Sequence, residues 1–124
     1  MSHPATTIGT TICGVRITPL RLTVVFLTAA MSIASLMPSD LAPRGPIDDK
    51  IAHLGAYLFL TGLGMAGVRS TSGRWVCFLG LVTLGGLLEL GQLLVPGRTC
   101  DPLDMAANTC GAILAFSAGR IWNG

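Results

Sequence analysis

The chain has 124 residues, of which 51% are hydrophobic and only 11% are charged, with a mean hydropathy of +0.68. Soluble domains carry roughly 25% charged residues, so this composition is typical of an integral membrane protein with one domain and leaves no room for a separate soluble catalytic domain. The formal net charge is only +2, and a chain without a basic stripe is not expected to bind nucleic acid.

The N-terminal region, residues 1–18, is expected to be a flexible cytoplasmic tail, because its beginning is rich in threonine and serine. Arg16 and Arg21 precede the first apolar segment, as basic residues do in a signal peptide. The apolar run over 22–37 exceeds the roughly 7–15 residues of a secretory core and lacks a clear A-x-A cleavage site. We therefore favour an uncleaved signal anchor over a cleaved signal peptide.

Four apolar segments follow, at about 20–37, 51–68, 75–95 and 103–121. Each is close to the roughly 20 residues that a helix needs to cross a ~30 Å hydrocarbon core. Breaker residues separate them: Pro38, Pro43 and Pro46, then Ser70 to Gly73, then Pro96 and Gly97. We predict an all-α fold, a four-helix transmembrane bundle with short loops, forming a single domain over 19–124.

The distribution of charge predicts an orientation. With the N-terminus inside, the cytoplasmic side holds Arg16, Arg21, Arg69, Arg74 and Arg120, and the outer side holds Arg44, Lys50 and Arg98. This excess of inner positive charge favours cytoplasmic N- and C-termini. All the acidic residues then fall on the outer side: Asp40, Asp48, Asp49, Glu89, Asp101 and Asp104.

Polar side chains recur near the outer ends of three expected helices. The candidate binding residues are Asp49, Lys50, His53, Tyr57, Glu89, Gln92, Arg98, Asp104 and Asn108. Within each helix, their spacing of three or four residues places them on one face. Because polar groups facing lipid would be unpaired, we expect them to converge on a pocket inside the bundle at the outer leaflet.

A stripe of small residues marks the fourth segment at four-residue spacing: Ala107, Gly111, Ala115 and Gly119. Such a stripe lets a second helix approach closely. Asp104 and Asn108 project within the same arc, and therefore toward the bundle interior. Gly85, on the Glu89 face of the third segment, is expected to allow a similar approach.

Each polar residue also has a purely structural explanation. Asp49 or Asp104 can stabilise a helix N-terminus, Tyr57 can pack, and His53 and Asn108 can join helices by hydrogen bonds. Glu89 is harder to explain in this way, because a carboxylate at that depth needs a partner. The candidate partners are Lys50, His53 and Arg98.

The ordered set of residues resembles the VanZ-like family of small integral membrane proteins. The resemblance rests on Asp49-Lys50, His53, Tyr57, Glu89, Gln92, Pro96-Gly97-Arg98, Asp104, Ala107-Asn108-Thr109 and Gly111-Ala112, and it covers about 48–119. It implies a bacterial envelope protein of the inner membrane related to an accessory protein of glycopeptide-resistance clusters, and it assigns no reaction. Members vary around Cys100, Asp101 and Pro102, so the resemblance assigns no role to these residues.

Two functions follow from these residues. In the first, the pocket binds or processes an envelope lipid or lipid-linked cell-wall precursor: Lys50 and Arg98 hold a phosphate or carboxylate, and the candidate catalytic residues are His53, Glu89 and Asp104. In the second, the chain is a non-catalytic scaffold or accessory subunit of a larger membrane complex, or a homo-oligomer. Ion transport is disfavoured, because the inner halves of the helices contain no ionisable residue to continue a path.

No metal site or cofactor is expected from the sequence. His53 is the only histidine near the cluster, since His3 lies in the tail, and one histidine is a weak indication of zinc. Glu89, Asp104 and Asp49 could offer oxygen ligands to Ca²⁺ or Mg²⁺, but their spacing does not establish that they converge. The four cysteines show no paired spacing typical of a metal site or a disulfide framework.

Overall fold

The computed structural model describes residues 10–12, 15–42 and 48–122. Pro43, Arg44 and Pro46 of the first loop lie outside these described residues, as do His3 and most of the expected flexible tail.

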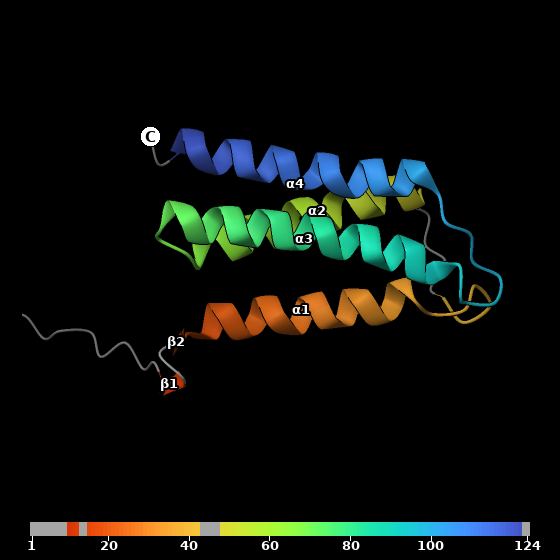
Figure 1. Cartoon of the computed structure of the whole chain (residues 1–124), viewed down its shortest axis with the longest axis horizontal. Coiled ribbons are helices and arrows are strands. Elements are labelled where there is room, and N and C mark those ends of the chain that lie inside the picture. The colour runs from red at the N-terminus through yellow and green to blue at the C-terminus, as the bar shows by residue number, and fades with distance from the viewer. Residues whose placement is uncertain (1–9, 13–14, 43–47, 123–124) are drawn as a thin grey trace, which may run out of the picture.

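Four helices alternate in direction along a common axis: α1 (Pro19–Ser35), α2 (Asp49–Ala66), α3 (Thr71–Gln92) and α4 (Pro102–Trp122) (Figure 1). The prediction of an all-helical, four-helix fold is confirmed. The ends of α1 and α3 and the beginnings of α2 and α4 lie together, and we call this the polar end. The opposite end of the bundle is called the basic end.

The beginning of α3 differs most from the prediction. Ser70 was expected to open a loop that runs to Gly73, but its hydroxyl oxygen accepts a 3.1 Å hydrogen bond from the backbone N–H of Gly73. This is N-cap geometry, in which a serine side chain satisfies one of the free N–H groups of the first turn. The helix therefore starts at Thr71, about one turn earlier than hydropathy suggested.

Two short strands precede α1, within the region expected to be a flexible tail. Strands β1 (Thr10–Ile12) and β2 (Val15–Ile17) pair antiparallel, with Thr10 opposite Ile17. Threonine, valine and isoleucine favour extended backbone, which gives this pairing a local physical basis. The chain then enters α1 directly, with Thr18 as the N-cap and Pro19 in the first turn.

Helices α2 and α4 approach each other closely. An added Cβ at Gly111 would overlap the carbonyl oxygen of Leu54 and lie 3.0 Å from the amide nitrogen of Leu58, both in α2. At Gly119, an added Cβ would lie 2.7 Å from the terminal methyl of Met65. Glycines in α4 therefore set how closely its backbone approaches that of α2.

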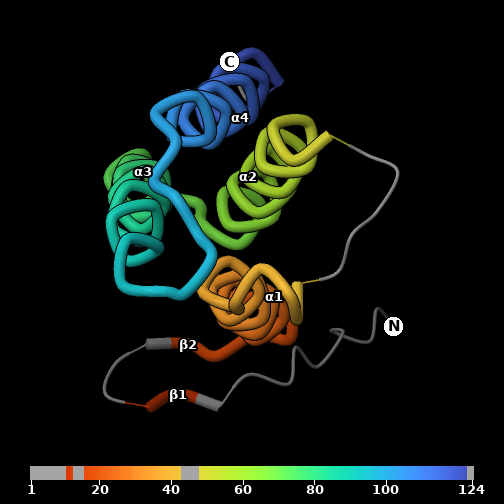
Figure 2. Tube along the Cα trace, turned by 90° about the vertical axis from the view of Figure 1, so that its right-hand side faces the viewer, coloured from red at the N-terminus to blue at the C-terminus, as the bar shows by residue number. Residues whose placement is uncertain are grey.

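Helix α1 is the outer member of the bundle. Seen end-on, it lies on the opposite side of α2 from α4 (Figure 2). Tyr57, Leu60 and Leu81 form one buried hydrophobic cluster, with Leu27 and Met31 of α1 packed against it. No residue of α1 is itself buried, so this helix is held mainly by its two ends and one apolar face.

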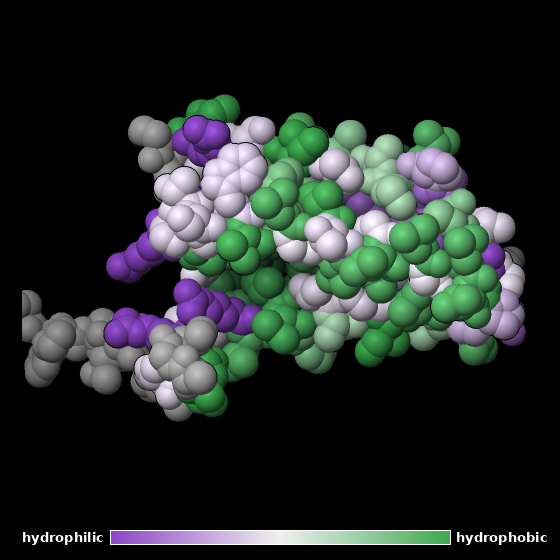
Figure 3. All heavy atoms as spheres, in the orientation of Figure 1, coloured by the Kyte–Doolittle hydropathy of each residue, from purple (hydrophilic) through white to green (hydrophobic). Residues whose placement is uncertain are grey.

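Only one helix in the described part of the chain, α3, is both long and apolar enough to cross a membrane, while α1 is apolar but has 17 residues. Helices α2 and α4 include the ionisable residues of the polar end, such as Lys50 and Asp104, which lower their hydropathy. Hydrophobic side chains nevertheless cover much of the visible surface between the ends of the bundle (Figure 3).

Candidate functional site

The polar end contains a cavity of about 750 Å³. Six of the nine candidate binding residues line it: Asp49, Lys50, His53, Gln92, Arg98 and Asp104. The other three, Tyr57, Glu89 and Asn108, are almost completely buried behind its wall. Helix direction explains this grouping, because antiparallel packing brings the N-termini of α2 and α4, where acidic residues are favourable, to the C-termini of α1 and α3.

Lys50 joins the beginnings of α2 and α4. Its ammonium nitrogen lies 3.0 Å from Asp101 Oδ2 and 3.4 Å from Asp104 Oδ1. The contact with Asp101 is a hydrogen bond, whereas Asp104 Oδ1 is buried without a hydrogen-bond partner among the described residues. Lys50 is 43% exposed at its side chain and so remains accessible from the cavity.

Asp101 also organises this corner, although the resemblance assigned it no role. Its Oδ1 accepts a 2.8 Å hydrogen bond from the backbone N–H of Leu103, which caps the start of α4. This bond, and then the bond from Lys50, hold the pKa of Asp101 below its usual value of 3.8. The signal was present in the sequence, since an aspartate directly before a proline is a typical N-cap followed by a first helical residue.

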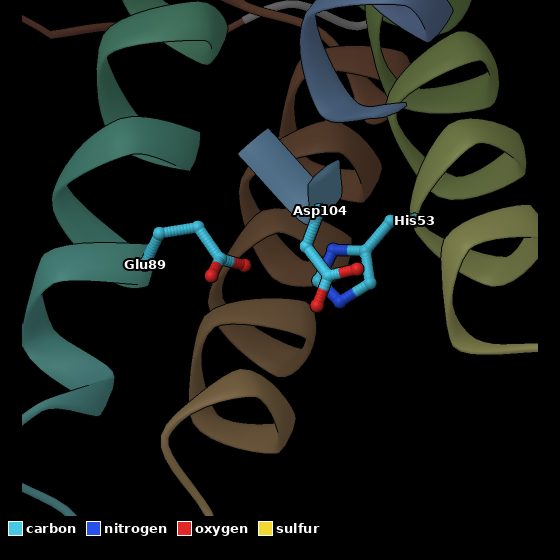
Figure 4. Close-up of side chains that lie close together, drawn as sticks. All are labelled: His53, Glu89 and Asp104. Atoms are coloured by element: carbon cyan, nitrogen blue, oxygen red, sulfur yellow. The ribbon is translucent and has the colours of Figure 1, made fainter. Parts of the chain in front are cut away.

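Glu89 is 1% exposed and points toward His53 and Asp104 (Figure 4). Its Oε2 accepts a 3.4 Å hydrogen bond from the backbone N–H of Asp101. Among the described residues, no lysine or arginine forms an ion pair with it. Of the three expected partners only His53 lies beside Glu89, because Lys50 is engaged with the two aspartates and Arg98 is directed elsewhere.

His53 is held by Asn108 across the α2–α4 contact. The distance between His53 Nδ1 and Asn108 Oδ1 is 2.8 Å. Because an amide oxygen only accepts, a hydrogen bond in this orientation has Nδ1 as the donor, and the neutral form of the ring then has its lone pair on Nε2. The imidazole can therefore accept a proton or bind a cation through Nε2.

Arg98 and Gln92 both reach the C-terminus of α1. Arg98 Nε donates to the carbonyl oxygen of Met37 at 2.9 Å, with Nη2 3.5 Å from that of Ala34. Gln92 Nε2 donates to the carbonyl oxygen of Ser35 at 3.1 Å. Ser35 is the last residue of α1 and Met37 lies two residues beyond it, so both side chains bond carbonyl groups at or just after the end of the helix. The positive charge of Arg98 also lies near the negative end of the helix dipole.

The Pro96-Gly97 turn positions Arg98 for this role. Gly97 has a φ of +74°, a backbone conformation that residues other than glycine rarely adopt. An added Cβ at Gly97 would also overlap the hydroxyl of Ser39 in the loop after α1. The glycine thus allows the loop between α3 and α4 to lie against the end of α1.

Tyr57 lies in the core rather than on the cavity wall. It is 2% exposed, and an added Cβ at Gly85 of α3 would lie 3.0 Å from its hydroxyl oxygen. The glycine leaves room for the tyrosine ring between α2 and α3. Tyr57 therefore contributes to the packing of α2 against α3 next to the site and does not line the cavity.

Comparison with known proteins identifies the family. No curated protein and no solved structure matches the chain significantly. Residues 15–123, almost the whole chain, match the family described as VanZ/LLP1. The chain belongs to the VanZ/LLP1 family.

Proposed function

We propose that this VanZ-family protein is a multi-pass protein of the bacterial inner membrane, and that its polar end opens toward the outer leaflet. The proposed ligand is the anionic headgroup of an envelope lipid or lipid-linked cell-wall precursor. One observation carries this proposal: the cavity of about 750 Å³ combines an accessible cation, Lys50, with His53 and with apolar residues of α1.

The membrane placement of all four helices is supported by their exposed surfaces. Large apolar side chains are exposed on all four helices, including Phe26, Phe59, Val76 and Ile121, which are 71%, 57%, 72% and 83% exposed. Water-soluble monomers rarely expose extended apolar surface of this kind. A lipid environment would accommodate it, and it would leave the charged residues at the two ends of the bundle.

The cavity wall suits an amphiphilic ligand. Met31 and Ala34 of α1 line the same cavity as Lys50 and His53. An anionic headgroup can accept hydrogen bonds from the lysine while the adjoining acyl or prenyl chain follows the apolar face of α1. If the ligand is processed as well as bound, the Nε2 atom of His53 is the group best placed to accept a proton.

The binding test uses tag-free protein in detergent or nanodiscs, with a polyprenyl phosphate as the anionic probe and phosphatidylcholine as the zwitterionic one. Lys50→Ala should weaken polyprenyl phosphate binding by about tenfold or more, because it removes a charge-assisted hydrogen bond. Arg74→Ala, at the basic end, is the matched control and should bind normally. Equal binding of both probes by wild-type protein, or unchanged binding by Lys50→Ala, would refute the proposal.

A scaffold or accessory-subunit function is the second candidate, and the bonds from Arg98 and Gln92 to the end of α1 favour it. In these bonds, two candidate ligand-binding side chains join α1 to the rest of the bundle. On this alternative, replacing cavity residues lowers the yield of folded protein without changing lipid selectivity. Bulky substitutions at exposed α1 positions such as Phe26 would then abolish co-purification of a stoichiometric membrane partner or a second copy.

A further inference from the structure

Three side chains from three helices meet at the inner wall of the cavity. His53 of α2, Glu89 of α3 and Asp104 of α4 each offer one ligand atom, and these atoms all lie within 4.8 Å of one another (Figure 4). Two ligands of one ion with bonds of about 2.1–2.4 Å lie at most about 4.2–4.8 Å apart. A single cation between the three atoms could therefore contact all of them.

The charges around this cluster leave it short of a cation. Glu89 is 1% exposed, and its only bond from the described residues is the 3.4 Å one from the Asp101 N–H. Asp104 Oδ1 is buried and lacks a hydrogen bond, and the nearby Lys50 is shared with Asp101. Two carboxylates close together and away from water need a positive partner, either a metal ion or a proton, which can be shared between them or carried by His53.

His53 has a hydrogen-bond partner on one ring nitrogen, so the other nitrogen is available to a ligand. The hydrogen bond between Nδ1 and Asn108 Oδ1 fixes the ring and directs the Nε2 lone pair away from Asn108. Histidines that bind metals commonly donate their other ring N–H to an oxygen in this way, which orients the ring and raises its basicity. Asn108 is 2% exposed, and among the described residues its side chain forms a hydrogen bond only with His53.

We propose that His53, Glu89 and Asp104 bind one divalent transition-metal ion, Mn²⁺ or Zn²⁺. One imidazole nitrogen with two carboxylate oxygens suits these ions better than Ca²⁺ or Mg²⁺, which prefer oxygen alone. His53 and Asp104 line the cavity while Glu89 lies behind it, so the open coordination positions face the cavity. The sequence indicates no metal site, because spacing along the chain does not reveal this convergence.

The metal site itself rests on the geometry of these three residues. That the ion helps to hold a phosphate oxygen of the bound headgroup rests in addition on the proposed function. An ion beside Lys50 would place two positive groups on the same side of the cavity, which is the arrangement that commonly binds phosphate.

The test is metal binding by full-length, tag-free protein that has been treated with a chelator and returned to buffer without lipid ligand. Titration with MnCl₂, followed by loss of the free Mn²⁺ electron paramagnetic resonance signal, and with ZnCl₂, followed by calorimetry, should give one ion per chain. His53→Ala, Glu89→Gln and Asp104→Asn should each weaken binding by at least about tenfold, as removal of a ligand or its support commonly does. Asp40→Asn and His3→Ala, which change an exposed acid and the other histidine, should bind as wild type does.

The wild-type titration decides the proposal even where a variant fails to fold. If wild-type protein binds neither ion, or if it binds equally well after Glu89→Gln with circular dichroism showing a folded protein, the site is refuted and a shared proton remains as the neutralising group. Co²⁺ provides a second readout, because the wild-type complex should show visible absorption bands that change in His53→Ala.

Failure of this proposal is distinguishable from failure of the proposed function. Polyprenyl phosphate binding that depends on Lys50 but is unchanged by a chelator would refute the metal and leave the lipid pocket standing. Metal binding with no preference for the anionic lipid would have the opposite meaning.

Discussion

The two ends of the bundle carry opposite charges. All six acidic residues of the chain lie at the polar end, in the loop after α1, at the start of α2, near the end of α3 and at the start of α4. The described residues of the basic end contain only cations among the ionised groups: Arg16, Arg21, Arg69, Arg74 and Arg120. The same helices thus present two different electrostatic environments.

The ends also use their charged residues differently. At the basic end, Arg21 Nε donates to the carbonyl oxygen of Gly67 at 3.3 Å, and Arg74 Nε donates to that of Val68 at 3.3 Å. These cations satisfy backbone carbonyls and require no side-chain partner. At the polar end, carboxylates meet an imidazole and an ammonium group across three helices, so their fit depends on how the helices pack.

A comparison of the two ends shows that a group of charged residues is not sufficient for a candidate binding site. The basic end has a cavity of about 480 Å³, but it is almost entirely apolar, and its arginines serve the helix ends. The polar end has fewer cations, yet it has a buried acid, Glu89, that forms no ion pair with a lysine or arginine of the described chain. The burial of Glu89 without a lysine or arginine partner among the described residues distinguishes the candidate site more than the number of charges does.

The largest loss of stability is expected from a substitution at Gly111, where the backbones of α2 and α4 approach each other closely. Gly111→Leu should destabilise the fold by about 3 kcal/mol or more, because the added atoms meet the backbone of α2 at Leu54 and Leu58 and not a flexible side chain. The measurement is unfolding in detergent followed by circular dichroism. Gly62→Leu is the control, since an added Cβ there meets nothing within 4 Å, and equal losses in both variants would contradict the packing argument.

A smaller effect, confined to the polar end, is expected at Asn108. Asn108→Leu removes the acceptor for His53 Nδ1 and should cost about 1–3 kcal/mol of unfolding free energy, because a buried polar group loses its partner. Cys110→Leu, at an exposed position on the same helix, should stay close to wild type. Histidine NMR would reveal whether His53 has lost its fixed tautomer, and a variant that kept both stability and tautomer would show that this bond is unimportant.

Arg98 and Arg21 offer a direct comparison of the two ends, because each donates from Nε to a carbonyl oxygen just beyond the C-terminus of a helix. Replacing either by glutamine should lower the unfolding free energy by about 0.3–1 kcal/mol, through loss of a favourable charge at the helix dipole. Similar losses would indicate a common capping role. A much larger loss of polyprenyl phosphate binding than of stability in Arg98→Gln alone would show that this arginine also contacts the ligand.

The smallest effect is a pH dependence that belongs to the polar end. The pKa of Asp101 is lower in the folded chain than its usual 3.8, so its stabilising contribution is complete above about pH 4 and is lost as the pH falls through the lower, folded value. Asp101→Asn should flatten this part of the curve of stability against pH. Asp40→Asn changes an exposed acid whose side chain has no hydrogen bond or ion pair among the described residues, so it should leave the curve unchanged, and an identical flattening there would refute the assignment.

Much of the fold could be predicted because hydropathy and helix length are local properties. The four apolar segments became four helices, and the polar residues of each segment fell at one end. The start of α3 was misplaced because a serine was interpreted as part of a loop when it acts as an N-cap. The β1–β2 pair was missed because three-residue strands are too short to give a periodic signal.

The candidate site was only partly predictable. Helical spacing grouped residues such as Glu89 and Gln92 on one face, and antiparallel order brought three such faces to one end. Helical spacing did not indicate that Arg98 would donate hydrogen bonds to backbone carbonyls at the end of α1. It also did not indicate that Asp101 would contact both Lys50 and Glu89. Those partners lie on other elements, and no local pattern specifies them.

By itself, the sequence determined the number of helices, their alternating direction and the separation of basic and acidic residues between the two ends. Only the tertiary structure decided which polar groups meet, bringing His53, Glu89 and Asp104 within 4.8 Å while pairing Lys50 with Asp101 and Asp104. The physical reason is that residue spacing sets the face and depth of a side chain within its own helix. The rotation and separation of neighbouring helices are set by contacts such as Gly111 against Leu54, which depend on the whole bundle.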